Sequence, residues 1–449
     1  MSWSDHAIWW QVHPLSFLGA ESTALPTDAP PRHRLPVLVD WLDHLVGLGC
    51  NGLALGPVFA AETHGYDTTD HFRVDPRLGT EDDLLELVER AAARGVRILF
   101  DGVFNHVGRS FAPFVDVTRH GSASPYADWF VPEGDDFRTF EGHSHLVALN
   151  HASPAVADHV VAVLDHWLER GIAGWRLDAA YAVPRPFWRT VTERVRSRHP
   201  GAWFSGEVIH GDYAAYVTEG GLDSVTQYEL WKAIWSSLND RNPHELAWAL
   251  KRHNAMVDTF APQTFVGNHD VTRVASRLHE PRHLAHALTV LFTVGGTPSV
   301  YAGDERAWPG VKEERAGGDD AIRPAFPAAP SGLGSDGLPV ERLHQTLVGI
   351  RRRHSWLVRA QTRVHTLDNT VLSYTLTAPD SGSAVAVALN FGLAPATADI
   401  PAASWTRAAG DASVEAATGS LSLPPLGWFI ATTSRAHIPA RRAGHLSGP

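Results

Sequence analysis

The stretch Gly171-Ile-Ala-Gly-Trp-Arg-Leu-Asp-Ala-Ala180 organises the rest of this 449-residue chain. Side chains alternate across a strand, so a strand here places Arg176 and Asp178 on one face and Trp175 and Leu177 on the other. A carboxylate two residues from an arginine on one face lies near a positive charge, which favours its ionised form. The pair fits a catalytic nucleophile or a buried ion pair in a core, and this stretch alone leaves both interpretations open.

Strand-like and helix-like segments alternate along the first 350 residues. Besides the strand above, strands are expected at residues 7–12, 51–58, 96–100, 202–206, 222–227, 263–267 and 298–302. Helices are expected at residues 35–48, 80–93, 155–170, 187–198, 230–238, 244–257, 284–294 and 340–353, and a loop at 64–71. Such alternation indicates parallel strands joined by right-handed crossovers, and eight units predict a closed (β/α)8 barrel.

Three regions interrupt or follow this alternation. Residues 108–150 mix Pro, Gly, His and aromatic residues without a period, and short alternating strands separated by turn residues follow residue 357. The sequence therefore predicts an α/β TIM barrel formed by residues 1–107 and 151–356, with a small inserted subdomain at 108–150 after the third strand. A C-terminal all-β sandwich domain is expected at 357–434 and a frayed tail at 435–449.

Composition restricts the possible partners. The formal net charge is −11, and basic residues form a run only at residues 351–353, which argues against a nucleic-acid partner. No stretch approaches the ~18 apolar residues of a membrane span, and the N-terminus lacks a signal-peptide pattern. Cys50, the single cysteine, can form no internal disulfide. We expect a cytoplasmic protein without a membrane partner, and the sequence leaves its oligomeric state open.

Polar residues stand where four of the predicted strands end. These segments are Asp101-Gly-Val-Phe-Asn-His106, Arg176-Leu-Asp178, Ser205-Gly-Glu207 and Gly267-Asn-His-Asp270. In a parallel barrel the carboxyl ends of the strands form one rim, where active sites lie. One such residue alone could cap a helix or bind loop amides. Several ionisable groups on one rim would cost stability, which usually marks a functional site.

These segments resemble the signature regions of the α-amylase family, glycoside hydrolase family 13. In the order above, they are similar to the family's first, second, third and fourth regions. Further similarity is found at Gly65-Tyr-Asp67, at Val147-Ala-Leu-Asn150 and at Gly296-Thr-Pro-Ser-Val-Tyr-Ala-Gly-Asp-Glu305. The resemblance covers roughly residues 8–353, and it implies a TIM barrel followed by a β domain.

At the matching positions, the resemblance implies that Asp178 is the nucleophile, Glu207 the general acid and base, and Asp270 the third carboxylate, which holds sugar hydroxyls. A retaining glycosidase needs one ionised carboxylate and one protonated carboxyl, ~5–5.5 Å apart. Arg176 is expected to keep Asp178 charged. Glu207 has no cation near it in the sequence, and the aromatic Trp203 and Phe204 suggest a drier setting that would hold its proton.

The resemblance also implies substrate-binding residues. Tyr66 matches the family's stacking tyrosine, and His106 and His269 match histidines that hydrogen-bond the sugar being cleaved. Asp101, Arg176 and His64 complete the expected set. Exo-acting α-glucosidases of the family usually carry an acidic residue where this chain has His64, so the position is more similar to amylases and neopullulanases.

Metal dependence is not expected. Residues 17–34 lack the Asp-rich calcium loop found in many relatives, and Tyr181 and Ala182 replace the Lys-His pair of many calcium-dependent amylases. Asn105 matches a family residue that can bind calcium, so calcium binding stays possible. No cofactor is expected to be required.

The leading hypothesis is a retaining hydrolase of α-glucosidic bonds, chiefly α-1,4, in short starch-derived malto-oligosaccharides, acting through a covalent intermediate. The insertion and the long loop after the eighth strand would form a partly closed pocket that favours short chains. Transglycosylases and isomerases of the family, including trehalose-synthase-like enzymes, share the three acids and remain alternatives. A catalytically inactive sugar-binding relative is the other alternative, against which the intact set of acids argues.

Overall fold

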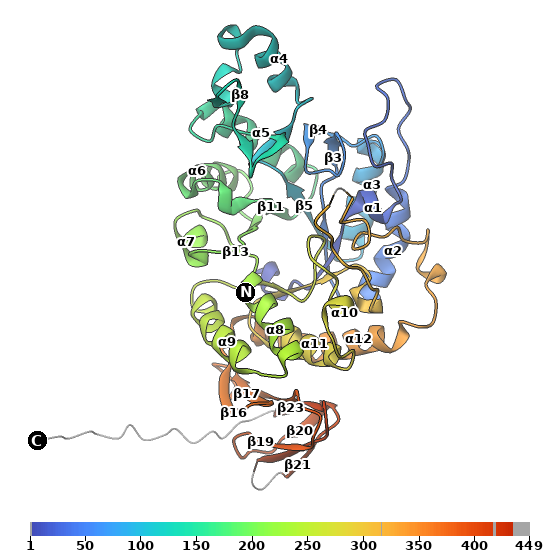
Figure 1. Cartoon of the computed structure of the whole chain (residues 1–449), viewed down its shortest axis with the longest axis vertical. Coiled ribbons are helices and arrows are strands. Elements are labelled where there is room, and N and C mark those ends of the chain that lie inside the picture. Colours follow the sequence, from blue (N-terminus) through green and yellow to red (C-terminus); the bar gives the residue numbers. More distant parts are fainter. Residues whose placement is uncertain (1, 316, 416–418, 434–449) are drawn as a thin grey trace, which may run out of the picture.

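The computed structural model describes residues 2–315, 317–415 and 419–433. Eight parallel strands form its central sheet (Figure 1). In chain order they are β1 (Trp9–Val12), β2 (Gly52–Leu55), β5 (Arg97–Gly102), β11 (Gly174–Leu177), β12 (Trp203–Gly206), β13 (Ser224–Val225), β14 (Gln263–Phe265) and β15 (Thr297–Tyr301). A parallel bridge between Thr226 and Gln263 joins the two end strands and closes the ring. The predicted TIM barrel is confirmed, although the sixth strand is reduced to two residues.

Helices connect and surround these strands. They are α1 (Pro14–Phe17), α2 (Pro36–Gly47), α3 (Glu81–Ala93), α5 (Pro154–Leu168), α6 (Arg185–Arg196), α7 (Tyr213–Thr218), α8 (Tyr228–Asp240), α9 (His244–Val257), α10 (Val274–Arg277), α11 (His283–Thr293) and α12 (Leu338–Arg353). Thr80 caps α3 in a capping box, with its backbone N–H 2.7 Å from Asp83 Oδ2. The Ser153 hydroxyl precedes α5 but donates to Asp128 in the insertion and does not cap the helix.

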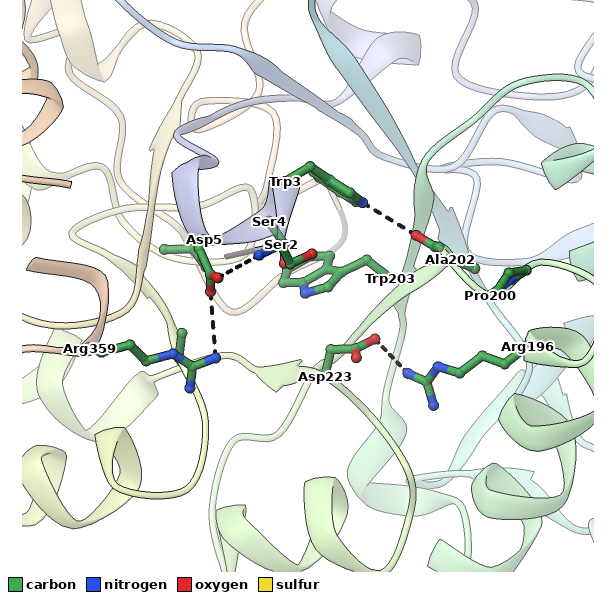
Figure 2. A pocket seen from close by; sticks show the side chains of 13 residues that line it. Ser2, Trp3, Ser4, Asp5, Arg196, Pro200, Ala202, Trp203, Asp223 and Arg359 are labelled. Atoms are coloured by element: carbon green, nitrogen blue, oxygen red, sulfur yellow. Dashed lines mark hydrogen bonds and ion pairs between the residues drawn. The ribbon is translucent and has the colours of Figure 1, made fainter. Parts of the chain in front are cut away.

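The inside of the barrel is apolar and aromatic where the strands begin. Trp9 and Trp203 stack there with ring centroids 5.5 Å apart, and a Cβ on Gly52 would lie 2.2 Å from the Trp9 ring. Below them lies a cavity of about 230 Å³ (Figure 2). Its charged lining residues are paired, Asp5 with Arg359 at 3.5 Å and Arg196 with Asp223 at 2.6 Å. We call Trp3, Trp9, Trp203 and these two ion pairs the barrel floor.

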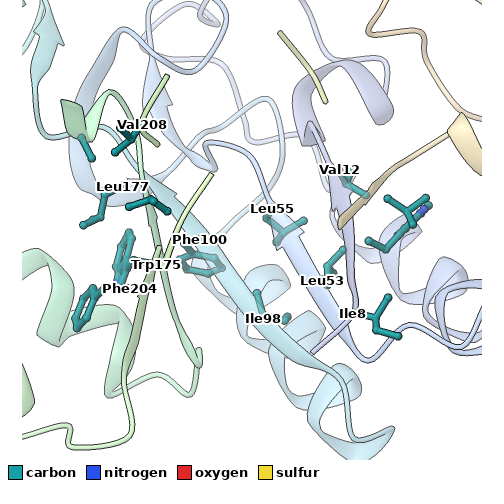
Figure 3. Packing of buried hydrophobic residues seen from close by; sticks show 14 of the residues in the cluster. Ile8, Val12, Leu53, Leu55, Ile98, Phe100, Trp175, Leu177, Phe204 and Val208 are labelled. Carbon is teal, nitrogen blue, oxygen red and sulfur yellow. The ribbon is translucent and has the colours of Figure 1, made fainter. Parts of the chain in front are cut away.

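The outer faces of the strands pack against the helices. Figure 3 shows part of this layer, with Ile8, Val12, Leu53, Leu55, Ile98, Phe100, Trp175, Leu177, Phe204 and Val208. Trp175 and Leu177 therefore face the helices while Arg176 faces the lumen, as the alternation in this strand predicts.

The insertion after β5 forms its own small sheet. Strands β6 (His106–Gly108), β9 (Thr139–Phe140) and β10 (His143–Ala148) are antiparallel, with α4 (Ala112–His120) and the hairpin of β7 (Pro132–Glu133) and β8 (Asp136–Phe137) beside them. The loop predicted at 64–71 is wrong in part. Strand β4 (Thr68–Val74) pairs with β3 (Phe59–Ala61), and Asp67 accepts the Thr63 N–H at 3.0 Å in the turn. The polar residues of β4 lack the apolar alternation that would have indicated a strand.

Two antiparallel sheets form the C-terminal part, at the opposite end of the molecule from the insertion (Figure 1). One contains β16 (Arg363–Leu367), β17 (Val371–Thr377), β18 (Ala384–Asn390), β23 (Trp428–Thr433) and β20 (Thr406–Gly410), and the other β19 (Ala396–Asp399), β22 (Ser420–Leu423) and β21 (Ser413–Glu415). Apolar residues from both sheets form one core, as in a sandwich. The domain limits stay predictions, and the tail at 435–449 lies outside the described residues. None of the described helices has the length and apolar character needed to cross a membrane.

Candidate active site

Arg176 lies at the centre of a carboxylate cluster on the rim of the barrel. Strand register sets it beside Asp101 on one side and Ser205 on the other. Its Nη1 lies 2.6 Å from Asp101 Oδ2 and 3.2 Å from Asp178 Oδ1. Its Nη2 lies 2.7 Å from Glu207 Oε1. One buried guanidinium therefore contacts three buried carboxylates.

Glu207 directly follows β12, and its surroundings differ from the prediction. The contact with Arg176 shows that a cation does lie beside it, because the neighbouring strand supplies one that the local sequence does not. The predicted aromatic neighbours lie elsewhere, since Trp203 is in the barrel floor and Phe204 faces the helices. The other contacts of Glu207 are polar: Oε2 accepts the Ala179 N–H at 3.0 Å, and Oε1 accepts the Tyr228 hydroxyl at 3.1 Å.

Asp270 lies on the same rim, after β14, and two side chains, Arg323 and His269, hold its carboxylate. Arg323 Nη2 lies 2.8 Å from Oδ1, and His269 Nε2 lies 2.9 Å from Oδ2. Gln11 Nε2 donates to the other ring nitrogen of His269 at 3.0 Å. The side chain of Asp270 remains 31% exposed, so a ligand can reach it from solvent.

The predicted binding residues form an aromatic wall beside these acids. Tyr66 and His269 are stacked with centroids 5.4 Å apart, and the Tyr66 hydroxyl contacts His269 and donates to Asp101 at 3.1 Å. His106 Nε2 binds the Tyr66 carbonyl at 3.0 Å, and His64 Nδ1 accepts the Tyr66 N–H at 3.2 Å. All nine residues predicted from the sequence are thus linked to one another at one site.

Burial and charge shift the pKa values of this cluster in opposite directions. Burial, followed by the charge of Glu207, raises the pKa of Asp178 well above its usual range despite Arg176. Burial also raises the pKa of Asp101. Burial opposes the ionisation of Asp270 too, but His269 and Arg323 outweigh it and hold that pKa well below its usual range. Burial and Glu207 thus oppose the ionisation of Asp178, whereas Arg176 favours it. That Arg176 keeps Asp178 charged stays a prediction.

Burial favours the neutral form of two histidines of the wall, His106 and His64. Burial lowers the pKa of His106 to about 3 and also lowers that of His64. A buried neutral imidazole can hydrogen-bond a sugar hydroxyl without adding a charge to the site.

Two connections narrow the space above the acids. Phe140, at the tip of the hairpin of β9 and β10, stacks on His106 with centroids 4.7 Å apart, and the Tyr181 hydroxyl donates to Glu141 at 2.8 Å. On the other side, the loop after β15 supplies Arg323 to Asp270. The insertion therefore contacts residues beside the acids, and the loop contacts Asp270 directly.

Sequence reasoning missed Arg323 and three further residues of the site. Gln11 and His13 follow the alternation of β1 toward the lumen, and His13 stacks beside Tyr66 at 6.2 Å, so the alternation itself could have indicated them. Tyr228 is the first residue of α8, which follows a two-residue strand, and no sequence motif around it indicates a site residue.

The described residues contain no group of three or more His, Cys, Asp or Glu side chains placed to hold a metal ion. Asn105, which the family resemblance links to calcium, contacts His106 Nδ1 through its amide nitrogen at 3.1 Å. That no metal is required stays a prediction.

The fold and the site define a (β/α)8 barrel of the type on which glycoside hydrolases are built, with several acids gathered at the carboxyl ends of its strands. The family model for the α-amylase catalytic domain matches residues 11–357. The chain belongs to the α-amylase family, glycoside hydrolase family 13.

Several relatives in the family are similar to this chain in sequence. A cyclomaltodextrinase of Bacillus sp is 32% identical over 333 residues, which cover 68% of this chain and 60% of that protein. An intracellular maltogenic amylase of Bacillus subtilis is 30% identical over 332 residues, covering 68% of this chain and 56% of that protein. The chain thus spans well under two thirds of the length of these relatives.

Among solved structures, a cyclic α-maltosyl-(1→6)-maltose hydrolase from Arthrobacter globiformis, in complex with cyclic α-maltosyl-(1→6)-maltose, has a TM-score of 0.81 at 26% identity. The similarity covers 96% of this chain and 99% of that one. The whole architecture, including the insertion and the β domain, therefore has a close structural counterpart.

Proposed function

We propose that this chain is a retaining α-glycosidase that hydrolyses α-1,4 bonds in short malto-oligosaccharides. The observation that carries the proposal is the shared guanidinium of Arg176, which contacts Asp178 at 3.2 Å and Glu207 at 2.7 Å. A double-displacement glycosidase requires two carboxyl groups close to each other, and Arg176 holds these two from adjacent strands.

In the first step, Asp178 attacks the anomeric carbon while the bond to the leaving oxygen breaks, and Glu207 gives that oxygen its proton. This step requires one proton on the two acids, and the raised pKa of Asp178, beside Glu207, favours its retention. When substrate binds, that proton belongs on Glu207 and the negative charge on Asp178, beside Arg176. In the second step Glu207 takes a proton from water, whose oxygen displaces Asp178 from the sugar.

The remaining residues of the site hold the sugar or the acids. We assign Asp270, His269 and His106 to sugar hydroxyls, Tyr66 to the face of the ring and His64 to the rim beside it. Both oxygens of Asp101 are bound to Arg176, so we assign Asp101 to positioning that guanidinium.

A short substrate is supported by two contacts of the insertion beside the acids, where Phe140 stacks on His106 and Tyr181 bonds to Glu141. The name cyclomaltodextrinase of one relative also supports an oligosaccharide substrate. We propose that the enzyme acts inside the cell, in line with the relative named an intracellular maltogenic amylase, and that its partner is the oligosaccharide alone. Transfer to a second sugar would use the same intermediate with a different acceptor.

Trapping of the covalent intermediate tests the proposal. 5-Fluoro-α-D-glucosyl fluoride has a good leaving group and a slowed second step, so it should label the enzyme with one sugar residue. Mass spectrometry of a proteolytic digest should find the label on the peptide that contains Asp178, and the Asp178→Asn variant should stay unlabelled. A label on another carboxylate, or none at all while the enzyme turns over maltotriose, would overturn the proposed mechanism.

A further inference from the structure

Tyr228 is a buried tyrosine that contacts the proposed acid and base of the reaction. It is the first residue of α8, and its hydroxyl lies 3.1 Å from Glu207 Oε1. Its ring is fixed from two sides, by Phe265 with centroids 4.9 Å apart and by Trp231 with centroids 5.8 Å apart. The mechanism described above does not use this residue.

A chain of hydrogen bonds sets the direction of the Tyr228 hydroxyl. The Asp270 backbone N–H donates to Asn268 Oδ1 at 2.9 Å, which fixes the orientation of that amide. The Asn268 amide nitrogen must then donate to the Tyr228 oxygen, 2.9 Å away. Since this oxygen accepts from Asn268, the hydroxyl hydrogen is left for the nearest acceptor, Glu207 Oε1.

We propose that Tyr228, oriented by Asn268, is a positioning residue that donates to Glu207 and stabilises the carboxylate left when Glu207 has given its proton to the leaving oxygen. The inference rests on the proposed function of Glu207 and extends it. The same bonds connect Glu207 to the backbone of Asp270, so the acid and the third carboxylate are held in one geometry.

Tyr228 keeps its hydroxyl proton throughout this step. The proton that reaches the leaving oxygen comes from Glu207, and the hydroxyl proton stays on Tyr228. Burial, followed by the charge of Glu207, raises the pKa of the Tyr228 hydroxyl well above its usual range, so it does not act as an acid itself. A hydrogen bond to a charged acceptor is stronger than one to a neutral acceptor, so the bond strengthens as Glu207 ionises.

Two substrates whose leaving groups differ in their need for protonation distinguish this positioning role from a purely structural role of Tyr228. The leaving sugar of maltotriose requires a proton, whereas the fluoride of α-maltosyl fluoride departs without one. For both substrates kcat/KM reports the first chemical step. Tyr228→Phe should lower kcat/KM for maltotriose by about tenfold to a hundredfold, the size expected for a lost hydrogen bond to a charged group. For the fluoride the loss should stay below about threefold.

The pH profile provides a second readout. Losing a donor to the carboxylate makes the protonated form of Glu207 easier to keep. The alkaline limb of kcat/KM for maltotriose should therefore move to higher pH in Tyr228→Phe, by about one pH unit. Tyr374→Phe is the matched control: it removes a buried hydroxyl bonded to Thr293 at 2.8 Å, between the barrel and the β domain, and should change neither profile.

Three results would overturn the inference. These are maltotriose activity above half of wild type, equal losses on both substrates, and an unmoved alkaline limb. If Tyr228→Phe does not fold, Asn268→Ala carries the same test, because the hydroxyl then loses its orientation. Glu207→Gln separates this inference from the proposed function. If Glu207→Gln loses maltotriose activity while Tyr228→Phe does not, only the role of Tyr228 is wrong, whereas an active Glu207→Gln would overturn the proposed function itself.

Discussion

The two ends of the barrel are built from the same strands but differ in how their carboxylates are paired with arginines. β12 begins at Trp203 in the barrel floor and leads directly into Glu207 on the rim. On the floor each carboxylate has its own arginine, as in the pair of Arg196 and Asp223 at 2.6 Å. On the rim three carboxylates share Arg176. Incomplete pairing in a buried site costs stability, so the difference favours the rim as the end that carries out the chemistry.

The largest expected effect lies at the rim. Asp178→Asn and Glu207→Gln should each lower kcat/KM for maltotriose by about a thousandfold or more, because nucleophile and acid act as one unit. Circular dichroism should show the fold of the wild type. If either variant kept a tenth of wild-type activity, that residue would not have its proposed role in the mechanism. The contrast between a catalytic rim and a structural floor would then lose support.

On the floor the same comparison predicts a loss of stability without a loss of chemistry. Trp203→Ala should lower the free energy of unfolding by about 3–5 kcal/mol, as expected when a buried tryptophan is truncated. Thermal melting and kcat on maltotriose below the melting range provide the measurements, and kcat should stay within about threefold of wild type. Trp248→Ala is the control, because Trp248 is 60% exposed and should leave the melting temperature unchanged. A thousandfold loss of kcat in Trp203→Ala would show that the floor takes part in catalysis.

Charge crowding at the rim also predicts how stability depends on pH. The pKa of Asp178 is raised in the folded protein, so the unfolded chain loses this proton at a lower pH than the folded protein does. As pH rises from the unfolded to the folded pKa of Asp178, the free energy of unfolding therefore falls. Above the folded pKa the whole loss remains. Asp178→Asn removes the cost and should raise the melting temperature at pH 8 by about 2 °C. The gain should shrink as pH falls toward about 4, the unfolded pKa. A variant that melts below wild type at pH 8 would contradict this assignment of the charge.

The smallest expected effect is that of removing metal ions. The rim is held by Arg176 and Arg323, so we expect exhaustive dialysis against a chelator to change neither the melting temperature nor kcat/KM. Recovery of a lost activity on adding calcium, and not magnesium, would instead assign a structural ion near Asn105.

Much of the fold could be predicted because each barrel strand carries its own signal. Apolar residues on the outer face, such as Trp175 and Leu177, pack against the helices, and polar residues stand where the strands end. Strand β4 was missed because its sequence is polar and its pairing with β3 depends on a turn closed by Asp67.

The predicted site residues do lie together, but their electrostatics could not be read from the sequence. Arg176 contacts Glu207 because β11 and β12 are in register, with Arg176 beside Ser205, and no residue near Glu207 in the sequence reveals this cation. Tyr228, the first residue of α8, also contacts Glu207, and no local pattern in the sequence reveals this contact. Contacts between neighbouring strands depend on register and rotamers, which local patterns do not specify.

The configuration of the first-formed product tests the central claim most directly. Attack by Asp178 inverts the anomeric carbon and water inverts it again, so the two displacements together retain the configuration. Proton NMR of maltotriose hydrolysis, recorded within the first minutes and before mutarotation, should show the α-anomer of the released sugar in excess over its equilibrium share. Initial release of the β-anomer would contradict a covalent intermediate on Asp178.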